Sequence, residues 1–386
     1  MIKNVSIIGA GISGLTAGCA LRQFGIETDI YEQSESITEF GAGITLSRNA
    51  TSLLNKLDVL EELASLSYIP KKSYIRDYKT GKKITGMDFS GFIASDRRDV
   101  VKVLSKKYLE LGGNLHLSHK VEQVEIEEGR VTFSNNSKVE ADLILACDGI
   151  KSTLRESYFD DSKPRFTNFV AWRGMSDINK LPEFEGNDQV NLYQGPGSHA
   201  VHYPIGHEGK VNFVAIQTSE TWEEESWRAE GDHQYFLEVF KEWNSNLLDI
   251  FAASEKVFRW GVFDRQQPSF LYKGNTVLLG DAAHPMVPFL GQGGCISIED
   301  SYTLALLVKG LDGDTEKVFK HYQDLRFKRG ISMQKRSNFQ GKYNHVANPA
   351  LVKVRNLVTK LFLNSTVENI HSYDAHEEAL NILRKS

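Results

Sequence analysis

The chain has 386 residues, of which 41% are hydrophobic and 25% charged, an ordinary globular composition that argues against disorder, collagen-like repeats and coiled coils. At roughly 150 residues per domain, this length predicts two to three domains. The 45 Lys and Arg residues against 50 Asp and Glu residues give a formal net charge of −5, so no basic excess attracts nucleic acid or an anionic membrane.

Three cysteines, Cys19, Cys147 and Cys295, are too few and too scattered for a disulfide framework or a Cys-x-x-Cys metal site, which indicates a reducing, cytoplasmic location. The histidines show no spacing typical of metal ligands. No stretch reaches the roughly 18 uninterrupted apolar residues of a membrane-spanning helix. We therefore expect no metal, no membrane partner and no nucleic-acid partner.

The first part of the chain alternates between predicted strands and helices. Strands are expected at residues 5–8, 28–32 and 141–147, with a further group of strands and polar turns at 121–139. Helices are expected at residues 15–24, 49–65 and 97–111. Strands joined by helices in this way form a parallel sheet, so we predict a Rossmann-like α/β domain.

The pattern changes at residue 165 to short alternating segments separated by Gly and Pro, which predicts an antiparallel sheet. After this sheet come a helix at 235–251, a strand at 276–279, a helix at 297–308 and a mostly helical region at 315–383. The predicted organisation is a Rossmann-like domain at 1–164 and 273–340, an inserted antiparallel-sheet domain at 165–272, and a C-terminal helical segment at 341–386.

The first motif is Gly-x-Gly-x-x-Gly, formed by Gly9, Gly11 and Gly14 between the first strand and the first helix, with Ser13 inside it. Such glycines permit a tight turn, let the backbone approach a pyrophosphate and let the helix pack on the strand. Glu32 ends the second strand, where a carboxylate binds ribose hydroxyls and repels a 2′-phosphate. A dinucleotide site is predicted; the alternative is a turn whose glycines serve packing alone. This motif does not separate FAD from NAD.

A second glycine-rich segment favours FAD. Asp281 follows the predicted strand 276–279, where an acid can bind the hydroxyls of an extended sugar chain. The glycines that follow, which would let the backbone lie against a flat ring, are Gly291, Gly293 and Gly294. The positive end of the next helix would stabilise negative charge on a reduced flavin. NAD has neither a ribityl chain nor a ring with this need.

With these segments the chain resembles the single-component FAD-dependent aromatic hydroxylases, or class A flavoprotein monooxygenases. It is most similar to the branch that contains salicylate hydroxylase and 3-hydroxybenzoate 6-hydroxylase. Three family motifs match in order, at residues 9–14, 147–155 and 280–285, and the resemblance covers roughly residues 2–340. It implies a para-hydroxybenzoate hydroxylase fold, with FAD on the Rossmann-like domain and substrate on the inserted sheet.

The resemblance also implies a reaction. NADH or NADPH visits transiently to reduce FAD, and a flavin C4a-hydroperoxide then transfers one atom of O2 to a small aromatic or heteroaromatic substrate. The motif residues place Asp281 at the ribityl chain. They place Asp148 and Arg155 at a segment that serves FAD and the reductant together, unless these two form a structural pair that ties a loop to the sheet.

Three further positions match FAD contacts of the family. Arg97 opens the helix at 97–111 and is expected to reach FAD, with the adjacent Arg98 as the alternative. Gly43 matches a loop beside the flavin, and Val124 matches a position near the adenine.

The strand that begins at His199 supplies the expected catalytic residues. By alternation His199 and Tyr203 share one face, and His202 lies on the other. In the 3-hydroxybenzoate branch a His starts this strand and a Tyr precedes its Pro, a pattern that His199, Tyr203 and Pro204 match. We expect His199 to be the base that takes a phenolic proton, Tyr203 to hydrogen-bond the substrate and Gln292 to orient it. The alternative for His199 is a solvent-facing residue, and His202 is interpreted as structural.

Other residues keep two interpretations. Trp172 or Arg173 could meet an aromatic carboxylate, or they could be a core Trp and a surface Arg. His284 is interpreted as a loop organiser, and Cys295 as a small buried side chain rather than a nucleophile.

Two rival functions stay open: oxygenation or epoxidation of a bulkier scaffold, such as a polycyclic antibiotic or an isoprenoid, and a non-catalytic flavin-binding protein that acts through a partner. The choice between NADH and NADPH and between monomer and homodimer is also open. Amphipathic spacing in the C-terminal helices fits either a cap over the pocket or a dimer interface.

Overall fold

The parallel sheet predicted at the N-terminus is present in the computed structural model, which describes residues 2–37, 43–181, 189–206, 209–221 and 229–386. Its strands are β1 (Asn4–Ile8), β2 (Glu27–Tyr31), β7 (Asn114–His116), β11 (Leu143–Ala146), β17 (Tyr272–Lys273) and β18 (Thr276–Leu278). The order is β17-β18-β11-β1-β2-β7, and only the β17–β18 pair is antiparallel. The sheet therefore draws strands from both ends of the chain.

Helices surround this sheet. They are α1 (Ile12–Gln23), α2 (Arg48–Lys56), α3 (Leu60–Leu66), α4 (Arg97–Glu110), α5 (Thr153–Tyr158) and α8 (Gly293–Gly310). Smaller strands complete this half: the pair β3 (Gly43–Leu46) and β6 (Ile93–Asp96), and the set β8 (Val121–Glu125), β9 (Arg130–Phe133) and β10 (Lys138–Glu140). Helix α1 packs against both α4 and α8, which closes the apolar core of this half.

The second sheet has seven strands in the order β16-β12-β15-β14-β13-β4-β5. They are β4 (Lys72–Asp77), β5 (Lys83–Asp88), β12 (Arg165–Asp177), β13 (Gln189–Gly195), β14 (Ser198–Ile205), β15 (Lys210–Thr218) and β16 (Ser254–Asp264). Strands β4 and β5 come from residues that the sequence analysis assigned to the first domain, and β13 pairs with β4 in parallel. The inserted segment 165–272 thus supplies five strands of this sheet rather than all seven.

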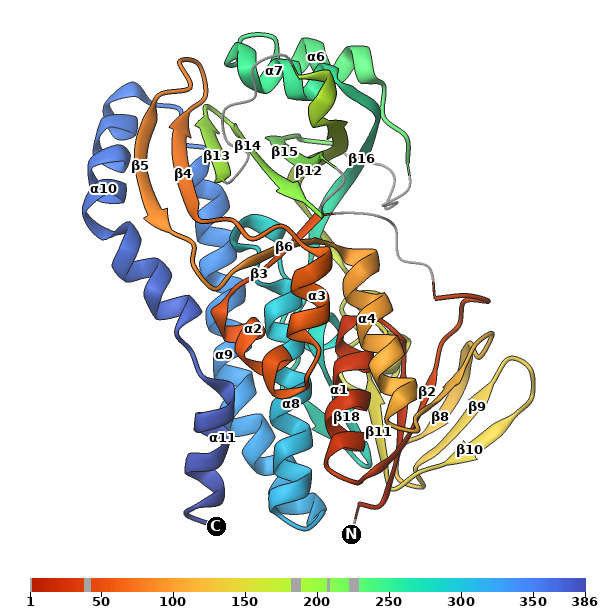
Figure 1. Cartoon of the computed structure of the whole chain (residues 1–386). Helices are drawn as coiled ribbons and strands as arrows, with labels where there is room; N and C mark the ends of the chain where they lie inside the picture. Colours follow the sequence, from red (N-terminus) through yellow and green to blue (C-terminus); the bar gives the residue numbers. More distant parts are fainter. Residues whose placement is uncertain (1, 38–42, 182–188, 207–208, 222–228) are drawn as a thin grey trace.

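The remaining helices cover the outside. They are α6 (His233–Phe240), α7 (Ser245–Ala252), α9 (Thr315–Asn344), α10 (Pro349–His371) and α11 (Ala375–Leu383), with short 3₁₀ turns η1 (Ile178–Lys180), η2 (Gly280–Ala282) and η3 (Pro288–Leu290). Figure 1 shows the parallel sheet in the lower half, the antiparallel sheet above it with α6 and α7 on its far side, and α10 alongside β5. Within the described residues, no helix has the length and apolarity to span a membrane.

Three of the expected helices differ most from the structure. The helix predicted at 49–65 is two helices, because Asp58 adopts a left-handed conformation (φ 54°) between α2 and α3. The helix predicted at 235–251 is likewise divided into α6 and α7, with Asn244 at the start of α7. Helix α8 begins at Gly293, earlier than the predicted residue 297, because glycine is a poor helix former and the sequence pattern does not mark it.

Candidate active site

A cavity of about 790 Å³ lies between the two sheets. On one side its wall is formed by residues at the carboxyl ends of β1, β2 and β11, which is where ligands bind in open parallel sheets. On the other side its wall is formed by side chains of β12, β14, β15 and β16. The volume is in the range of sites for cofactors and small ligands.

The first glycine turn is shaped by the backbone around it. Gly9 has a φ of 105°, and a Cβ there would lie 2.5 Å from the carbonyl oxygen of Cys147. A Cβ on Gly14 would lie 2.0 Å from the carbonyl oxygen of Gly9. In contrast, a Cβ on Gly11 would meet none of the described residues within 4 Å other than its chain neighbours, and Gly11 lines the cavity. Gly9 and Gly14 are therefore required by packing, whereas Gly11 leaves open space for a ligand.

The start of α1 and the end of β2 face this space. Gly11 precedes α1 and no side chain caps the helix, so the first N–H groups are available to a phosphate. Ser13 lines the cavity, with its Oγ 3.2 Å from that of Ser301. Glu32 also lines it, and its two carboxylate oxygens accept hydrogen bonds of 2.9 Å from the N–H groups of Ala10 and Ser34. Glu32 thus fixes the glycine turn while it faces the cavity.

The second glycine segment lies against the same cavity. Gly291, Gly293 and Gly294 all line it, and the last two form the first turn of α8. Asp281 lines the cavity and is surrounded by protein. Desolvation of its carboxyl raises the pKa of that group, and the nearby charge of Arg97 lowers it. The sequence motifs at residues 9–14 and 280–294, far apart in the chain, meet at one site.

Arg97, rather than Arg98, lines the cavity. Arg98 forms an ion pair with Asp96, at 2.5 Å, and its side chain is 57% exposed. Gly43 also lines the cavity, and its N–H donates to Oδ1 of Asn212 at 3.0 Å.

Asp148 lines the cavity but does not pair with Arg155. Its Oδ2 accepts a hydrogen bond from the N–H of Thr153 at 2.9 Å, whereas its Oδ1 is buried without a hydrogen-bond partner among the described residues. Arg155 instead forms an ion pair with Asp160 at 3.0 Å and donates to the carbonyl of Ala282 at 3.1 Å. Asp148 and Arg155 therefore do not pair with each other, but Arg155 is buried outside the cavity wall and ties the loop at Ala282, as the structural alternative expected. The unpaired oxygen of Asp148 is an acceptor suited to a ligand hydroxyl.

Val124 lies elsewhere than expected. Its side chain is buried in the core of the first half, and its carbonyl accepts a hydrogen bond from the Tyr158 hydroxyl. The cavity wall at this end is formed instead by residues around Val121, together with Tyr31 and Glu32. The expected contact of Val124 with a bound adenine is not supported by this position.

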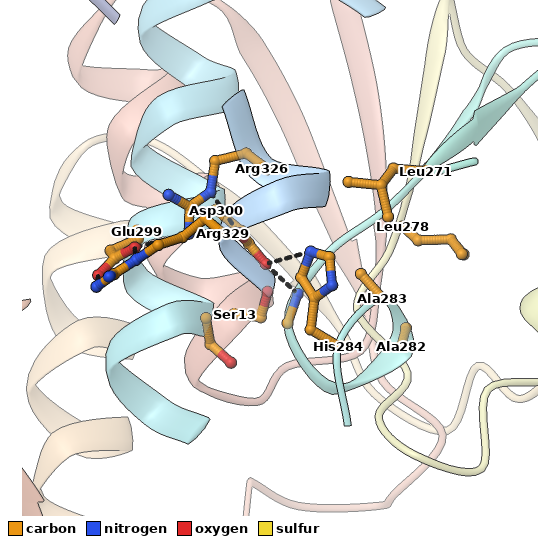
Figure 2. Close-up of polar contacts among 12 residues, drawn as sticks. Ser13, Leu271, Leu278, Ala282, Ala283, His284, Glu299, Asp300, Arg326 and Arg329 are labelled. Atoms are coloured by element: carbon orange, nitrogen blue, oxygen red, sulfur yellow. Dashed lines mark hydrogen bonds and ion pairs between the residues drawn. The ribbon is translucent and has the colours of Figure 1, made fainter. Parts of the chain in front are cut away.

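A buried ionic cluster supports the second glycine segment (Figure 2). Arg326 donates to Glu299 and to Asp300, each at 2.7 Å, and all three side chains are inaccessible to solvent. Oδ2 of Asp300 accepts the N–H of Gly280 at 3.1 Å and lies 3.9 Å from Nε2 of His284. Burial lowers the pKa of His284 to about 3, so this imidazole is neutral. The cluster anchors the loop that carries Asp281. His284 contributes a contact of 3.1 Å between its Nδ1 and Oε1 of Gln267, and its role as a loop organiser stays a prediction.

The wall opposite the glycines carries His199, Tyr203 and Arg173. All three are buried, at 4%, 6% and 5% exposure, so the alternatives of a solvent-facing His199 and a surface Arg173 are wrong. Burial lowers the pKa of His199 well below its usual value and raises that of Tyr203. The guanidinium of Arg173 lies 5.4 Å from the ring centre of Trp260, and Trp172 is fully buried in the core.

The side chain of Gln292 does not line the cavity. Its Nε2 donates to Oγ of Ser47 at 3.0 Å, and its Oε1 accepts from Nδ2 of Asn49 at 3.1 Å. These bonds engage both ends of the amide, so we do not propose it as a substrate contact. His202 lines a separate small cavity with Arg76, on the opposite face from His199.

Sequence reasoning missed one residue beside the site. His345 follows α9, and its Nε2 lies 2.6 Å from Nδ1 of His199. No motif marks His345, because the two histidines are far apart in the chain. The described residues of α10 and α11 do not line the cavity, so a cap formed by these two helices is not supported.

Cys295 is buried and its Sγ lies 3.4 Å from Oγ of Ser47. Burial raises the pKa of its thiol to about 11, which leaves it protonated and unsuited to nucleophilic attack. In the described part of the chain, no group of three or more His, Cys, Asp or Glu residues is arranged to hold a metal.

Comparison with known proteins agrees with this site. Residues 3–336 match the family described as FAD binding domain. The chain is 30% identical over 365 residues to a 3-amino-4-hydroxybenzoate 2-monooxygenase of Streptomyces platensis, covering 91% of each chain. It is 28% identical over 372 residues to the 3-hydroxybenzoate 6-hydroxylase of Klebsiella oxytoca, covering 93% of each. The architecture and these matches define an FAD-dependent monooxygenase.

Solved structures share the fold. A salicylate hydroxylase substrate complex superposes with a TM-score of 0.84 at 22% identity, covering 98% of this chain and 97% of the other. Klebsiella pneumoniae HpxO complexed with FAD and uric acid gives a TM-score of 0.81 at 22% identity, covering 99% and 96%. The chain belongs to the FAD-binding family of class A flavin monooxygenases, the aromatic hydroxylase family.

The residues present fit FAD. Space beside Gly11 admits a pyrophosphate against the start of α1, and the unpaired oxygen of Asp148 and the carboxylate of Asp281 can accept hydroxyl groups. The first turn of α8 brings its N–H groups and Gly293 to the cavity. A Cβ on Gly293 would approach only Oδ1 of Asp281, at 3.9 Å, so this turn leaves room for a flat ring.

Proposed function

We propose that the chain hydroxylates a small aromatic acid that carries a ring hydroxyl, with O2 and with NADH or NADPH as the electron donor. The observation that carries this proposal is Arg173, a buried cation in the cavity wall beside Tyr203. Burying a guanidinium is costly unless a partner compensates it. A substrate carboxylate would supply such a partner through charge-assisted hydrogen bonds.

The side chains around Arg173 suit the rest of such a molecule. Apolar residues of the cavity wall would contact the ring and exclude water, among them Val201, Ile216, Trp260 and Phe289. Tyr203 is protonated at neutral pH, because burial raises its pKa, and can donate a hydrogen bond to a substrate oxygen. His199 is neutral and can accept the phenolic proton, which makes the ring a better nucleophile.

The other wall would hold the cofactor. Gly11 and the start of α1 would bind the pyrophosphate, and Glu32 the ribose. Asp148 and Asp281 would bind hydroxyl groups, and the first turn of α8 would hold the ring. Bound FAD supplies electron transfer from the nicotinamide and the activation of O2. The chain's own part is to place the substrate ring beside the flavin and to keep water out.

Two relatives support the substrate class. The 3-amino-4-hydroxybenzoate 2-monooxygenase and the 3-hydroxybenzoate 6-hydroxylase are both named for benzoates that carry a ring hydroxyl. A carboxylate and a phenol on one ring are the two groups that Arg173 and His199 are suited to meet.

The test is a substrate panel with the purified, FAD-loaded protein. Hydroxybenzoates, their uncharged amides and unsubstituted phenols are compared for stimulation of NADH and NADPH oxidation, and products are identified by mass as the substrate plus one oxygen atom. We expect the acids to be preferred. Turnover only of polycyclic or isoprenoid compounds would support the rival scaffold, and a protein that binds FAD but oxidises neither donor with any substrate would support the non-catalytic alternative.

A further inference from the structure

Two buried imidazoles meet behind the substrate wall. His199 is the second residue of β14 and lines the cavity, and His345 lies directly after α9, outside the cavity wall. Nδ1 of His199 and Nε2 of His345 are 2.6 Å apart, a hydrogen-bond distance. The second imidazole thus comes from the C-terminal segment 341–386, for which the sequence analysis offered only a cap or a dimer interface.

The pair is enclosed by apolar groups. Phe289 packs edge-on against both rings, with centroid distances of 5.3 Å to His199 and 6.2 Å to His345. Phe169 packs against His345 at 5.1 Å, and Ile216 is the partner of His199 on β15. Among the described residues, the only titratable group acting on His199 is the other imidazole. Burial lowers the pKa of both rings, that of His345 to about 4, so the pair is uncharged at neutral pH.

Backbone contacts hold the second ring in place. The carbonyl of His345 accepts the N–H of Gly197, the residue just before β14, at 3.1 Å. The neighbouring Asn344 accepts a hydrogen bond from Nε2 of Gln194 on β13 at 2.8 Å. The end of α9 is thereby tied to the hairpin that carries His199, and the distance between the two rings is fixed on both sides.

Each neutral imidazole carries one N–H, and only one hydrogen can lie between Nδ1 of His199 and Nε2 of His345. The hydrogen bond therefore has two possible directions. Either Nδ1 of His199 carries the hydrogen and donates to His345, or Nε2 of His345 carries it and donates to His199. In the first arrangement Nε2 of His199 has a free lone pair; in the second it carries a hydrogen and cannot act as a base. Nδ1 of His345 has no hydrogen-bond partner among the described residues, and Phe169 packs edge-to-face with the same ring at a centroid distance of 5.1 Å.

We propose that His345 is a positioning residue that accepts the Nδ1–H of His199 and so holds Nε2 of His199 as the acceptor for the substrate proton. This inference rests on the proposed function, in which His199 is the base. When Nε2 takes the phenolic proton, the hydrogen bond from Nδ1 to His345 stabilises the imidazolium that forms. The proton passes from the substrate oxygen to Nε2, and no other bond changes.

The first measurement reads the tautomer directly. FAD-loaded protein with ¹⁵N-labelled histidine is studied by NMR, and the signals of His199 are assigned as those that disappear in His199→Gln. We expect Nδ1 to carry hydrogen and Nε2 to be bare at neutral pH. In His345→Leu we expect this preference to be lost. A hydrogen on Nε2 of His199 in the wild type would overturn the proposal.

The second measurement compares turnover in two variants. His345→Leu removes the acceptor, and we expect kcat to fall about 10- to 100-fold with little change in KM, a loss typical of a mispositioned base. His345→Gln keeps an oxygen that can accept from Nδ1, and we expect it to recover part of the rate. A purely structural role predicts equal losses in the two variants, and that result would overturn the proposal.

A matched control is His371→Leu. His371 is as buried as His345, at 8% exposure, and also packs edge-on against a phenylalanine, Phe92, but it lies outside the cavity wall. We expect it to leave the His199 tautomer and kcat unchanged. Failure of the proposed function can be distinguished from failure of this inference. In the first case the wild type would turn over no aromatic acid, while NMR would still report the tautomer of His199. Retention of FAD in each variant shows that it is folded.

Discussion

The two walls of the cavity differ in whether backbone or side chains form most of their surface. The FAD wall is largely backbone, formed by two glycine turns and the first turns of α1 and α8, with the carboxylates of Glu32, Asp148 and Asp281 added to it. The substrate wall is made of side chains such as His199, Tyr203 and Arg173, supplied by strands β12, β14, β15 and β16. A wall that needs bare backbone can be met by glycine alone and leaves a strong sequence signature. A wall of side chains accepts many combinations and leaves a weaker one, here the pattern of His199, Tyr203 and Pro204.

The largest test of this comparison is at the FAD wall. Gly14→Ala places a Cβ 2.0 Å from the carbonyl oxygen of Gly9, where backbone meets backbone and neither can yield. We expect the variant to lose bound FAD completely and to be strongly destabilised. Thermal unfolding and the flavin absorption of the purified protein measure both effects.

Gly11→Ala is its counterpart, since the added Cβ lies more than 4 Å from the other described residues, apart from its neighbours in the chain. We expect the FAD-free protein to keep the thermal stability of the wild type, while FAD affinity falls about tenfold or more because the methyl group occupies the pyrophosphate's space. Quenching of FAD fluorescence on titration gives the affinity. Wild-type affinity in this variant would show that Gly11 does not face the cofactor.

The next effect is at the substrate wall. His199→Gln removes the proposed base, and we expect kcat to fall by about 10²- to 10⁴-fold with bound FAD retained. Because burial keeps the pKa of His199 well below its usual value, the wild type should show no loss of kcat/KM from this group as the pH falls from 8 to 6. An acid limb near the ordinary histidine pKa of about 6.5 that vanishes in His199→Gln would contradict this assignment.

Arg173 sharpens the comparison further. Arg173→Gln should weaken binding of a carboxylate substrate by about 2 kcal/mol or more, a rise in KM of about 30-fold, with a smaller effect on kcat. The matched control is the uncharged amide of the same substrate, whose KM should change little. Equal losses for acid and amide would show that Arg173 supports the wall without binding the carboxylate.

The smallest effect concerns a buried histidine in neither wall. Burial lowers the pKa of His371 to about 4 in the folded state, whereas an unfolded histidine titrates near 6.5. Folding stability is therefore undiminished above pH 6.5 and decreases as the pH falls toward 4, because the unfolded chain takes up the proton first. The loss of folding free energy amounts to roughly 2 kcal/mol at pH 5. His371→Leu should lose less stability between pH 7 and 5 than the wild type, as measured by denaturant unfolding. An identical loss in both would show that His371 is already charged in the fold.

The sequence predicted the fold and most of the FAD wall because each depends on local rules. Glycine spacing, a strand before it and a helix after it identify the turn at Gly9 to Gly14. The position of Val124 gives no support to the expected adenine contact, because its side chain packs in the core. Gln292 was misassigned for a similar reason: its amide has buried partners on α2 and just before it, at Asn49 and Ser47, that no local pattern reveals.

Long-range contacts account for the other gaps. Alternation placed His199 and Tyr203 on one face, but not whether that face was buried, and it could not show that Arg173 shares the cavity. His345 lies far along the chain from its partner, and nothing in its neighbours marks it. The sequence analysis assigned β4 and β5 to the first domain, because the residues of a strand do not determine which sheet the strand joins.

The placement of β4 and β5 has a practical consequence for engineering. A chimera that exchanges residues 165–272 alone with those of a relative would leave its new β13 beside a native β4, with mismatched side chains along a parallel pairing that joins separate parts of the chain. The exchangeable unit is discontinuous and includes residues 72–88. Specificity grafts that respect this division should give soluble hybrids, whereas those cut at the apparent domain boundary should misfold.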